Sequence, residues 1–224
     1  MRDRSHMTAI ARLSEAKYQM SIYSKYILPW GINAACGGKP VAKQRAKIVP
    51  QAKGMVLEVG IGSGLNLPFY DRAQVEKVWG LEPSVELRRM AEKVAGETDL
   101  AVDFIDLPGE EIPLADNSID TVLITYTLCT IPDTARALAQ IHRVLKPGAE
   151  LLFCEHGLAP DADVRRWQAR IDPVWSKFTG GCHINRPIDG LIRNAGFHIT
   201  QMDTMYIPGP RTHSFNYWGA AVAA

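Results

Sequence analysis

A glycine-rich stretch directly after a short apolar run is the feature that most constrains this chain. The run covers residues 56–59, Val-Leu-Glu-Val, and three glycines follow at alternate positions, Gly60, Gly62 and Gly64. Short apolar runs of this kind form buried parallel strands. Glycine permits the positive φ of a tight turn, and without a Cβ it leaves the backbone open to a ligand. The stretch therefore predicts a strand that turns into a helix, with a flat polar molecule bound at the turn.

The glycine spacing narrows the class of ligand. A dinucleotide fingerprint G-x-G-x-x-G would need its third glycine at position 65, which is Leu65. The spacing found is E-x-G-x-G-x-G with Glu58 inside the strand, and an acidic side chain beside the loop would repel a phosphate. This pattern resembles motif I of the class I S-adenosylmethionine (SAM) methyltransferases, so SAM, with S-adenosylhomocysteine as product, is the implied cofactor.

Composition excludes several classes of protein. The 224 residues fit one domain, and the formal net charge of +1 offers no global field for nucleic acid. No apolar run is long enough to span a membrane, which predicts a soluble protein. The four cysteines lie far apart in the sequence and form no C-x-x-C pair, so they predict reduced thiols in the cytoplasm and no metal site. We expect them to be dispersed, which disfavours a metalloid acceptor. They are Cys36, Cys129, Cys154 and Cys182.

The chain divides into a short leader, an N-terminal segment and one main domain. Residues 1–6 precede a second methionine and are typical of an expression scar. Residues 7–50 are expected to be helical, and the resemblance makes them a lid over the cofactor, with ordinary helix packing as the open alternative. The basic residues within 39–47 are interpreted as a solvated helix face. The methyltransferase domain is predicted over 51–224, with a helical insert at 159–183.

Strands and helices alternate through the main domain. Apolar runs at 75–81, 101–105, 119–124 and 150–154 predict further strands, and helical periodicity lies between most of them. This alternation indicates a doubly wound, mostly parallel sheet. Two final strands separated by Pro208-Gly209-Pro210 predict an antiparallel hairpin. The expected fold class is α/β, a Rossmann-like seven-stranded sheet with an antiparallel C-terminal hairpin, as in class I methyltransferases.

The carboxyl ends of the predicted strands supply the candidate cofactor residues. Glu82 ends the second strand, where its carboxylate can accept hydrogen bonds from both hydroxyls of a ribose. Ser84 is the expected N-cap of the following helix. Tyr126 and its neighbours follow the fourth strand and should face the ligand crevice. With the resemblance, the implied SAM site comprises Glu58, Gly60, Gly62, Gly64, Asn66, Glu82, Pro83, Glu110, Thr125, Tyr126 and Leu128, with Glu110 or a nearby N–H beside adenine.

Sequence motifs in the carboxyl half of the chain narrow the resemblance to one group of methyltransferases. W-x3-I-D-P-V-W begins at Trp167, G-C-H-I-N-R begins at Gly181, and L-C and E-H follow the fourth and fifth strands. These motifs are similar to the methyltransferase-like family that includes membrane-anchored alkyl thiol methyltransferases. Bacterial phospholipid and quinone-type methyltransferases also resemble the chain. The implied reaction is direct in-line methyl transfer to a small apolar acceptor, with a thiol as the favoured class. A lipid or quinone acceptor, which would bring contact with a membrane surface, and a non-catalytic SAM-binding module remain alternatives.

A thiol acceptor needs little activation, because its pKa of about 8.5 lies close to neutral pH. Candidate bases are His156, Asp172 and His183. Each has a structural alternative: a backbone-bonded histidine for His156, a helix boundary for Asp172, and a histidine that plays no part in catalysis for His183, because direct transfer needs no covalent enzyme intermediate. Aromatic and thiol side chains could line the acceptor pocket or simply pack in the core. These candidates are Tyr23, Trp30, Trp175 and Cys182. The sequence does not predict an oligomeric state.

Overall fold

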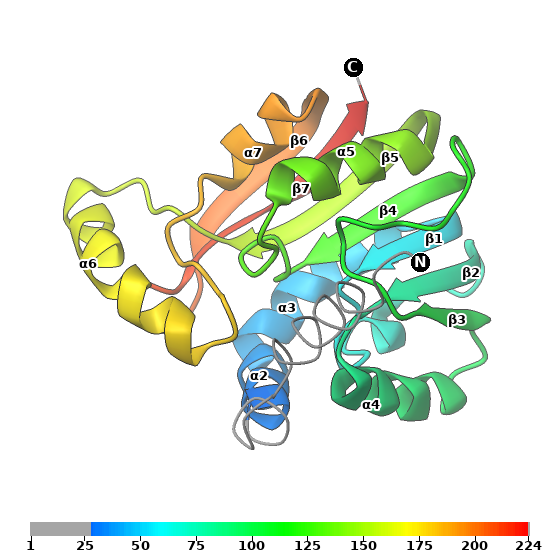
Figure 1. The fold of residues 1–224 in the computed structure, drawn as a ribbon, viewed down its shortest axis with the longest axis horizontal. Coiled ribbons are helices and arrows are strands. Elements are labelled where there is room, and N and C mark those ends of the chain that lie inside the picture. Colours follow the sequence, from blue (N-terminus) through cyan, green and yellow to red (C-terminus); the bar gives the residue numbers. More distant parts are fainter. Residues whose placement is uncertain (1–27, 224) are drawn as a thin grey trace, which may run out of the picture.

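The computed structural model describes residues 28–223. They form a single seven-stranded sheet with helices on both faces (Figure 1). The helix expected over residues 8–27, the leader at 1–6 and Tyr23 lie outside the described residues. None of the helices in the described part of the chain is long and apolar enough to cross a membrane.

The sheet has the strand order β3-β2-β1-β4-β5-β7-β6. Strands β1 to β5 pair in parallel, whereas β7 runs antiparallel to both β5 and β6. The predicted fold class, including the antiparallel C-terminal hairpin, is therefore confirmed. The strands are β1 (Gly54–Val59), β2 (Val75–Leu81), β3 (Val102–Ile105), β4 (Ile119–Thr125), β5 (Leu145–His156), β6 (Phe197–Tyr206) and β7 (Phe215–Ala223).

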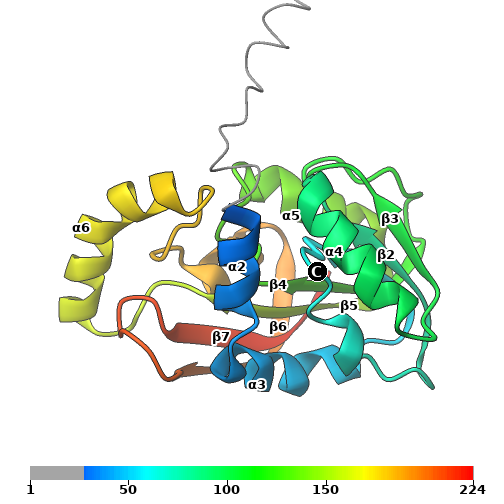
Figure 2. The same ribbon diagram turned by 90° about the horizontal axis from the view of Figure 1, so that it is seen from below.

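Two apolar cores lie on opposite faces of the sheet, because successive side chains of a strand point to opposite faces. On β1, Leu57 and Val59 join one core while Val56 joins the other. Helices α5 (Thr134–Val144) and α7 (Ile188–Asn194) cover the first face, and α3 (Lys39–Ile48) packs on the second, as Figure 2 shows. Both faces of the central strands are thus buried, which explains their nearly continuous apolar sequence.

The segment after the glycine turn differs from the expected helix. It forms only a 3₁₀ turn, η3 (Leu67–Phe69), before the chain enters β2; a second 3₁₀ turn, η2 (Val49–Gln51), precedes β1. Pro68 lies at the start of η3, and Asp71 accepts a hydrogen bond from the N–H of Ala73 in a turn. Few residues separate the glycines from β2, and these turn signals leave no room for a regular helix.

Helix α4 (Val85–Gly96) follows β2 and begins where the sequence predicts. The Ser84 side chain accepts a hydrogen bond from the N–H of Leu87 at 3.3 Å, so Ser84 is the N-cap. The helix approaches the glycine turn closely. A Cβ on Gly64, whose φ is +81°, would lie 3.0 Å from the Cα of Ala91, so this glycine permits the contact.

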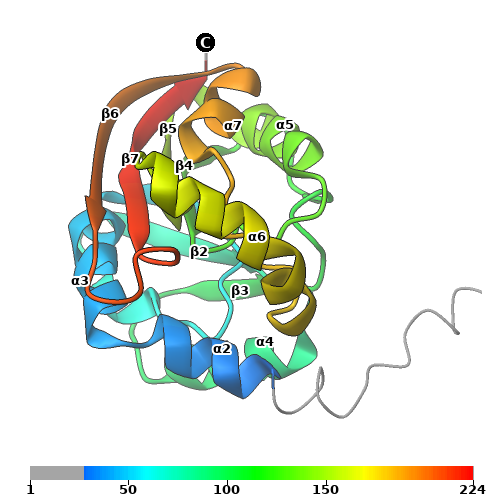
Figure 3. The ribbon, with the colours of Figure 1, turned by 90° about the vertical axis from the view of Figure 1, so that its left-hand side faces the viewer.

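Two helices stand at the ligand-facing end of the sheet (Figure 3). They are α2 (Leu28–Cys36) and α6 (Ala162–Phe178). Gln168 anchors α6, because its side-chain amide donates to the carbonyls of Gly157 and Ile184 and accepts from Ala159 N–H. Pro173 lies inside α6, so the reading of Asp172-Pro173 as a helix boundary is wrong.

Candidate functional site

A cavity of about 320 Å³ opens at the carboxyl ends of β1, β2 and β4. Its walls come from α2, the glycine turn, the tip of β2, the loop at 108–110 and the residues after β4. Such a position, at the edge where parallel strands end, is where open α/β sheets bind ligands. Of the predicted cofactor residues, those that line the cavity are Gly60, Gly62, Glu82, Pro83, Glu110, Thr125 and Tyr126.

Two glycines of the turn have conformations that no other residue would adopt without strain. Gly60 has φ +74°, and a Cβ there would lie 2.3 Å from the Thr127 side chain, so the turn can pass under the β4 loop only as glycine. Gly62 has φ +57°, and a Cβ there would meet nothing closer than 3.9 Å. Because Gly62 lines the cavity, its backbone is open to a ligand.

Glu82 is held at the tip of β2 by two backbone donors. Its Oε2 accepts from Gly62 N–H at 3.1 Å and its Oε1 from Ser84 N–H at 2.8 Å. Burial raises the pKa of Glu82 above its usual value, although these two N–H groups act in the opposite direction. Each carboxylate oxygen keeps a free lone pair. The side chain can therefore accept from two adjacent hydroxyl groups in the cavity.

Glu58 lies beneath the cavity instead of lining it. Its two oxygens accept from Asn66 Nδ2 at 2.8 Å and from Tyr70 Oη at 2.7 Å, and burial raises its pKa to about 7. Asn66 is also fully buried and bonds Thr125 and Arg45. Both predicted cofactor residues thus support the floor of the site, because their polar atoms are already occupied by neighbouring side chains.

Two other predicted cofactor residues also lie off the cavity wall. Gly64 faces α4, as described above, and Leu128 is fully buried in the core below α5. The backbone of Leu128 is what serves the site: its N–H donates to Glu155 Oε1 at 3.1 Å, and its carbonyl accepts from Arg186. The chain turns sharply after β4, which sends this side chain inward.

Arg45 is a site residue that the sequence interpretation missed. It lies 5% exposed on the wall of the cavity, where Nη1 donates to Asn66 Oδ1 and Thr125 Oγ1, both at 2.7 Å. Its guanidinium carbon stands 5.1 Å from the centre of the Tyr126 ring. The reading of the basic stretch as a solvated face is wrong at this position. The signal was helical spacing, since Val41, Arg45 and Ile48 share one face of α3.

Tyr126 links the cavity to the end of β5. It has φ +54°, a left-handed conformation that is uncommon for a residue other than glycine. The phenol donates to Asn216 Oδ1 at 2.6 Å, and the ring stacks on His156 with centroids 6.3 Å apart. Strained backbone of this kind gathers at functional sites. It holds the aromatic face of Tyr126 between Arg45 and His156.

A cluster of two cysteines and one histidine lies just beyond Tyr126. The ligand atoms of Cys129, His156 and Cys182 all lie within 4.8 Å of one another, and Cys182 Sγ is 3.3 Å from His156 Nε2. The expectation that the cysteines are dispersed is therefore wrong for this pair. The loops after β4 and α6 meet at the end of β5, although 53 positions separate the two cysteines in the sequence.

The cluster favours a charged pair. The hydrogen bond from Cys129 lowers the pKa of Cys182 and raises that of Cys129. Burial lowers the pKa of His156, but contact with the Cys182 sulfur raises it more, so its net shift is upward. A thiolate on Cys182 beside an imidazolium on His156 is the arrangement that these shifts support.

The other two predicted bases meet each other. Asp172 Oδ2 lies 2.7 Å from His183 Nδ1, and Asp172 Oδ1 accepts from Ile184 N–H at 2.8 Å. The Asp172 side chain is 9% exposed and that of His183 37%. Neither residue lines the cavity. Their geometry fixes the segment that carries Cys182 against α6.

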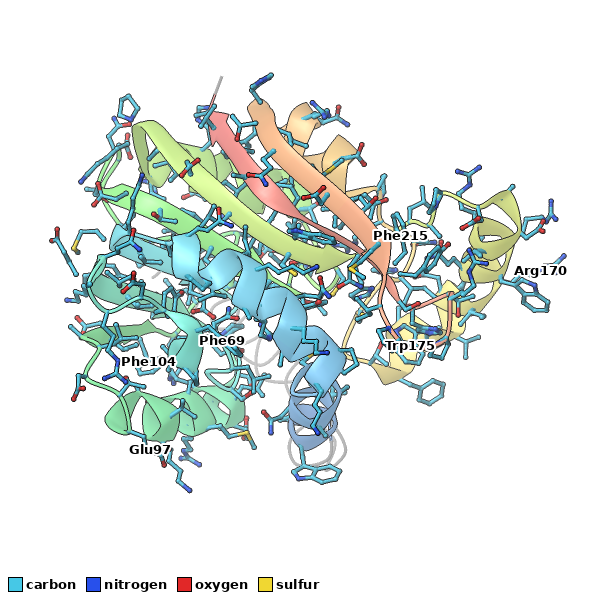
Figure 4. All side chains as sticks on the ribbon, turned by 180° about the vertical axis from the view of Figure 1, so that it is seen from behind. Phe69, Glu97, Phe104, Arg170, Trp175 and Phe215 are labelled. Atoms are coloured by element: carbon cyan, nitrogen blue, oxygen red, sulfur yellow. The ribbon has the colours of Figure 1, made fainter. Side chains whose placement is uncertain are left out.

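Of the predicted acceptor-pocket residues, Trp175 lies beside Cys182, whereas Trp30 lies apart from both. Trp175 lies where α6 meets the start of β7, near Phe215 in Figure 4, and its ring packs 4.3 Å from that of His213. Its Nε1 is buried, and its indole N–H is among the groups that lower the pKa of Cys182. Trp30 is 67% exposed and lines no cavity, because the turn of α2 directs Ile32, Asn33 and Cys36 inward instead. Cys182 belongs to the cluster described above.

Comparisons with known proteins agree on one family. A model of a methyltransferase domain matches residues 57–153. The thiol S-methyltransferase TMT1B of rat is 34% identical over 152 residues, 66% of this chain and 62% of the rat protein. Human TMT1B is 30% identical over 177 residues, 74% of this chain and 72% of the human protein. The chain thus spans less than two thirds of the rat relative's length.

Two further comparisons concern a lipid enzyme and the fold. The phosphatidylethanolamine N-methyltransferase of Cereibacter sphaeroides is 26% identical over 195 residues, 84% of this chain and 93% of that protein. A Haemonchus contortus N-methyltransferase structure with S-adenosylhomocysteine has a TM-score of 0.65 at 15% identity, covering 90% of this chain and 58% of that one. The second similarity concerns the fold alone.

Proposed function

This chain belongs to the family of SAM-dependent methyltransferases, and we propose that it transfers the methyl group of SAM to the thiol of a small, largely apolar molecule. The observation that carries the donor assignment is the paired placement of Glu82 and the open backbone of Gly62 in one cavity. Kinship with proteins named thiol S-methyltransferases, at 30–34% identity, supports the acceptor class.

The residues of the cavity fit SAM. We assign Glu82 to the ribose hydroxyls, since each of its oxygens keeps an acceptor site inside the cavity. Pro83 and Glu110 flank the expected adenine position, on the wall formed by the tip of β2 and the loop at 108–110. At the other end, Arg45 has a buried Nε without a partner among the described residues, which suits a carboxylate. We therefore place the amino-acid end of SAM beside Arg45.

The chemistry asks little of the protein beyond positioning. When bound, SAM supplies a methyl group on a sulfonium: the acceptor sulfur forms the new C–S bond as the old one breaks, and the old bond's electron pair stays on the departing S-adenosylhomocysteine. Alignment alone can contribute about 7–11 kcal/mol to such reactions. The aromatic face of Tyr126 lines the cavity and suits a nearby cation. The acceptor must still lose its proton to a base.

We assign that base to the pair of Cys182 and His156. Their sulfur and nitrogen lie 3.3 Å apart, and Cys182 is the thiol whose pKa the site lowers. The neutral imidazole of His156, whose pKa the site raises, can take the proton of an acceptor thiol, and the thiolate of Cys182 stabilises the imidazolium that forms. Asp172 and His183 act in this account as positioning residues, because they bond each other and Asp172 also bonds the backbone N–H of Ile184.

The test is calorimetry with S-adenosylhomocysteine, followed by mass spectrometry of an alkyl thiol panel incubated with SAM. We expect micromolar binding and products heavier by one methyl group in place of a hydrogen. Glu82→Ala should abolish most of the binding, and Glu97→Ala is the matched control because Glu97 is exposed at the far end of α4 (Figure 4). Absence of binding by the wild-type protein would contradict the proposal.

A phospholipid is the second candidate acceptor. It is favoured by kinship over 93% of a phosphatidylethanolamine N-methyltransferase and by large apolar side chains exposed on α2 and α6. These side chains are Trp30, Trp167, Val174 and Phe178. Vesicles containing phosphatidylethanolamine, offered with labelled SAM, separate the two acceptors. Label in the lipid with none in the thiols would replace our first proposal with this one.

A further inference from the structure

We propose that Cys129, His156 and Cys182 form a zinc site whose fourth position binds the acceptor thiol as a thiolate. The last part of this inference rests on the proposed function, whereas the zinc site itself does not. It assigns a metal to the three ligands and a binding mode to the acceptor. The sequence interpretation found no metal-ligand set, because the three residues are distant along the chain.

The geometry fits a tetrahedral ion. Zinc binds cysteine sulfur at about 2.3 Å and histidine nitrogen at about 2.0 Å, so tetrahedral ligand atoms stand roughly 3.5 to 3.8 Å apart. In the structure the three atoms lie within 4.8 Å of one another, and the Cys182–His156 separation is 3.3 Å. Small side-chain rotations are enough to place all three at bonding distance from one ion.

The fold brings the three ligands together from three separate segments. His156 ends β5, and Cys129 lies on the turn after the neighbouring strand β4. Cys182 follows the turn after α6, and that turn is fixed to the β4 loop because His183 N–H donates to the Cys129 carbonyl at 2.9 Å. Three separate segments therefore converge on one point through backbone contacts, which makes the site preorganised.

Glu155 supports the turn that carries Cys129. Its Oε1 accepts from the N–H groups of Thr127 and Leu128 at 2.7 and 3.1 Å. The residue is fully buried, so these bonds are protected from water. Groups that orient metal ligands in this way commonly contribute 10- to 100-fold to metal affinity, as an order of magnitude. Glu155 is a positioning residue in this inference.

The ligand types select zinc among common ions. Two thiolates and an imidazole are soft or borderline donors, whereas magnesium and calcium require oxygen. Two cysteines and one histidine leave one position open, which is typical of zinc sites that bind a substrate and not of closed structural sites. Copper also binds soft thiolate donors, so the metal is identified directly in the test below.

The open position lies toward the cavity. Cys129 is buried, but His156 and Cys182 are partly exposed. Residues on both flanks of the cluster line the cavity, namely Tyr126, Thr127, Thr130 and Gly180. Cys36 also lines the cavity, close enough to Cys182 for the charge on one thiol to influence the other, but it is not in the ligand set. None of the three ligands lines the cavity itself, so in this inference the acceptor thiol approaches the fourth position past these flanking residues.

Coordination would activate the acceptor. As the Zn–S bond forms, the S–H bond breaks and its proton leaves to solvent, because a thiol bound to zinc is deprotonated outright. The bound sulfur keeps lone pairs with which to attack a methyl group. After transfer the sulfur is a neutral thioether, a weak ligand, so the product can leave. In this mode zinc replaces the free His156 imidazole as the group that accounts for the acceptor's proton.

Metal content is the first readout, and it needs no activity. The protein is loaded with zinc, freed of excess and analysed for all first-row metals by mass spectrometry, with a phosphine reductant because a thiol would occupy the site. We expect about one zinc per chain. Cys129→Ser and Cys182→Ser should each lower zinc affinity by at least about 100-fold. Cys154→Ser is the control, a buried cysteine on β5 outside the set.

Circular dichroism and thermal unfolding establish that each variant is folded, and His156→Gln provides a ligand variant that leaves both thiols in place. Little zinc in the wild-type protein would overturn the inference. So would copper in place of zinc, or equal zinc affinity in the ligand variants and the Cys154→Ser control.

Cobalt substitution tests the acceptor's binding mode in the absence of SAM. Tetrahedral Co²⁺ bound by thiolates absorbs visible light, and its spectrum should change when an alkyl thiol is added but not when the matching alcohol is added. An unchanged spectrum would overturn the binding mode. If zinc-free protein methylates thiols as fast as zinc-loaded protein, the inference fails and the proposed function stands. If the spectrum changes but no product forms, the zinc site stands and the proposed function fails.

Discussion

The two sides of the cavity are built in different ways. The donor side, formed by the glycine turn after β1 and by Glu82, comes from residues 60–83, a single β-turn-β unit. The acceptor side, formed by Cys129, His156 and Cys182, comes from three segments spread over more than fifty positions. The donor side therefore depends on local spacing, and the acceptor side depends on the strand order of the whole sheet.

This difference decides which side tolerates change. A local turn is specified by a few glycines and one carboxylate, so a single substitution removes a contact without disturbing the rest. A site assembled from distant loops needs residues whose role is to hold those loops, such as Asp172 and Glu155. Substitutions there should alter stability and acceptor binding together, which the following predictions use.

The largest expected effect is on the pH dependence of stability, where each side has one buried glutamate whose pKa is raised to about 7. Burial raises the pKa of Glu58 and of Glu155 from 4.5 to about 7. Between these values the folded protein binds more protons than the unfolded chain. The free energy of unfolding should therefore fall as the pH rises from about 4.5 to about 7, by about 3 kcal/mol per group at most.

Glu58→Gln and Glu155→Gln should each remove the contribution of one carboxyl group to this pH dependence of the free energy of unfolding. Denaturant unfolding at a series of pH values from 4.5 to 8 measures it, and Glu97→Gln is the exposed control, which should leave the curve unchanged. Curves for the two buried-site variants that run parallel to the wild-type curve would show that these carboxylates are not buried as described.

The next largest effect is on the donor side alone. Glu82→Ala should weaken binding of S-adenosylhomocysteine by about 100-fold, because two hydrogen bonds to a charged group are lost. The unfolding midpoint should move little, since Ser84 remains to cap α4. Calorimetry measures the affinity, with Glu97→Ala beside it. Unchanged affinity would remove Glu82 from the donor site.

A smaller effect is expected on the acceptor side. Asp172→Ala leaves the buried N–H of Ile184 without its acceptor and frees His183, so the free energy of unfolding should fall by about 1–3 kcal/mol. The affinity for S-adenosylhomocysteine should stay within about twofold of wild type, whereas the KM for the thiol should rise. Asp163→Ala, an exposed change on the same helix, is the control. Loss of S-adenosylhomocysteine binding in Asp172→Ala would show that the two sides are not separable.

The smallest effect is expected at Trp30. Its side chain is 67% exposed on α2, so Trp30→Ala should change the free energy of unfolding by no more than about 0.5 kcal/mol. The KM for the thiol should also stay close to wild type, in contrast to Trp175→Ala beside the cluster. Steady-state kinetics of the two variants decide this. A larger KM change for Trp30 than for Trp175 would reverse our placement of the acceptor.

The same contrast explains what could be predicted from the sequence. The mostly parallel sheet, the hairpin and the positions of Glu82, Gly60 and Gly62 follow from patterns that span only a few residues, and these predictions match the structure. The burial of Glu58 and Asn66 beneath the cavity could not be predicted from the sequence. Motif spacing does not tell whether a polar side chain faces a ligand or supports a residue that faces it. Their partners Arg45 and Thr125 come from other segments.

Two features of the candidate site were found only in the tertiary structure. The helical periodicity of residues 39–48 indicates that Arg45 lies on the buried face of the helix. Counting the basic residues of this stretch without regard to their spacing does not show this. Cys129 and Cys182 carried none, because their meeting depends on β4 lying beside β5 and on the turn after α6 reaching back to the β4 loop. Dispersal along a sequence says nothing about distance once a parallel sheet brings strand ends to one edge.

The most direct test of the central claim is a crystal structure of the protein with S-adenosylhomocysteine. We predict that the ribose hydroxyls bond the carboxylate of Glu82, that the amino-acid end lies beside Arg45, and that the sulfur faces the cluster of Cys129, His156 and Cys182. A ligand bound elsewhere, or bound here with its sulfur directed away from that cluster, would contradict the division of the cavity into a donor and an acceptor side.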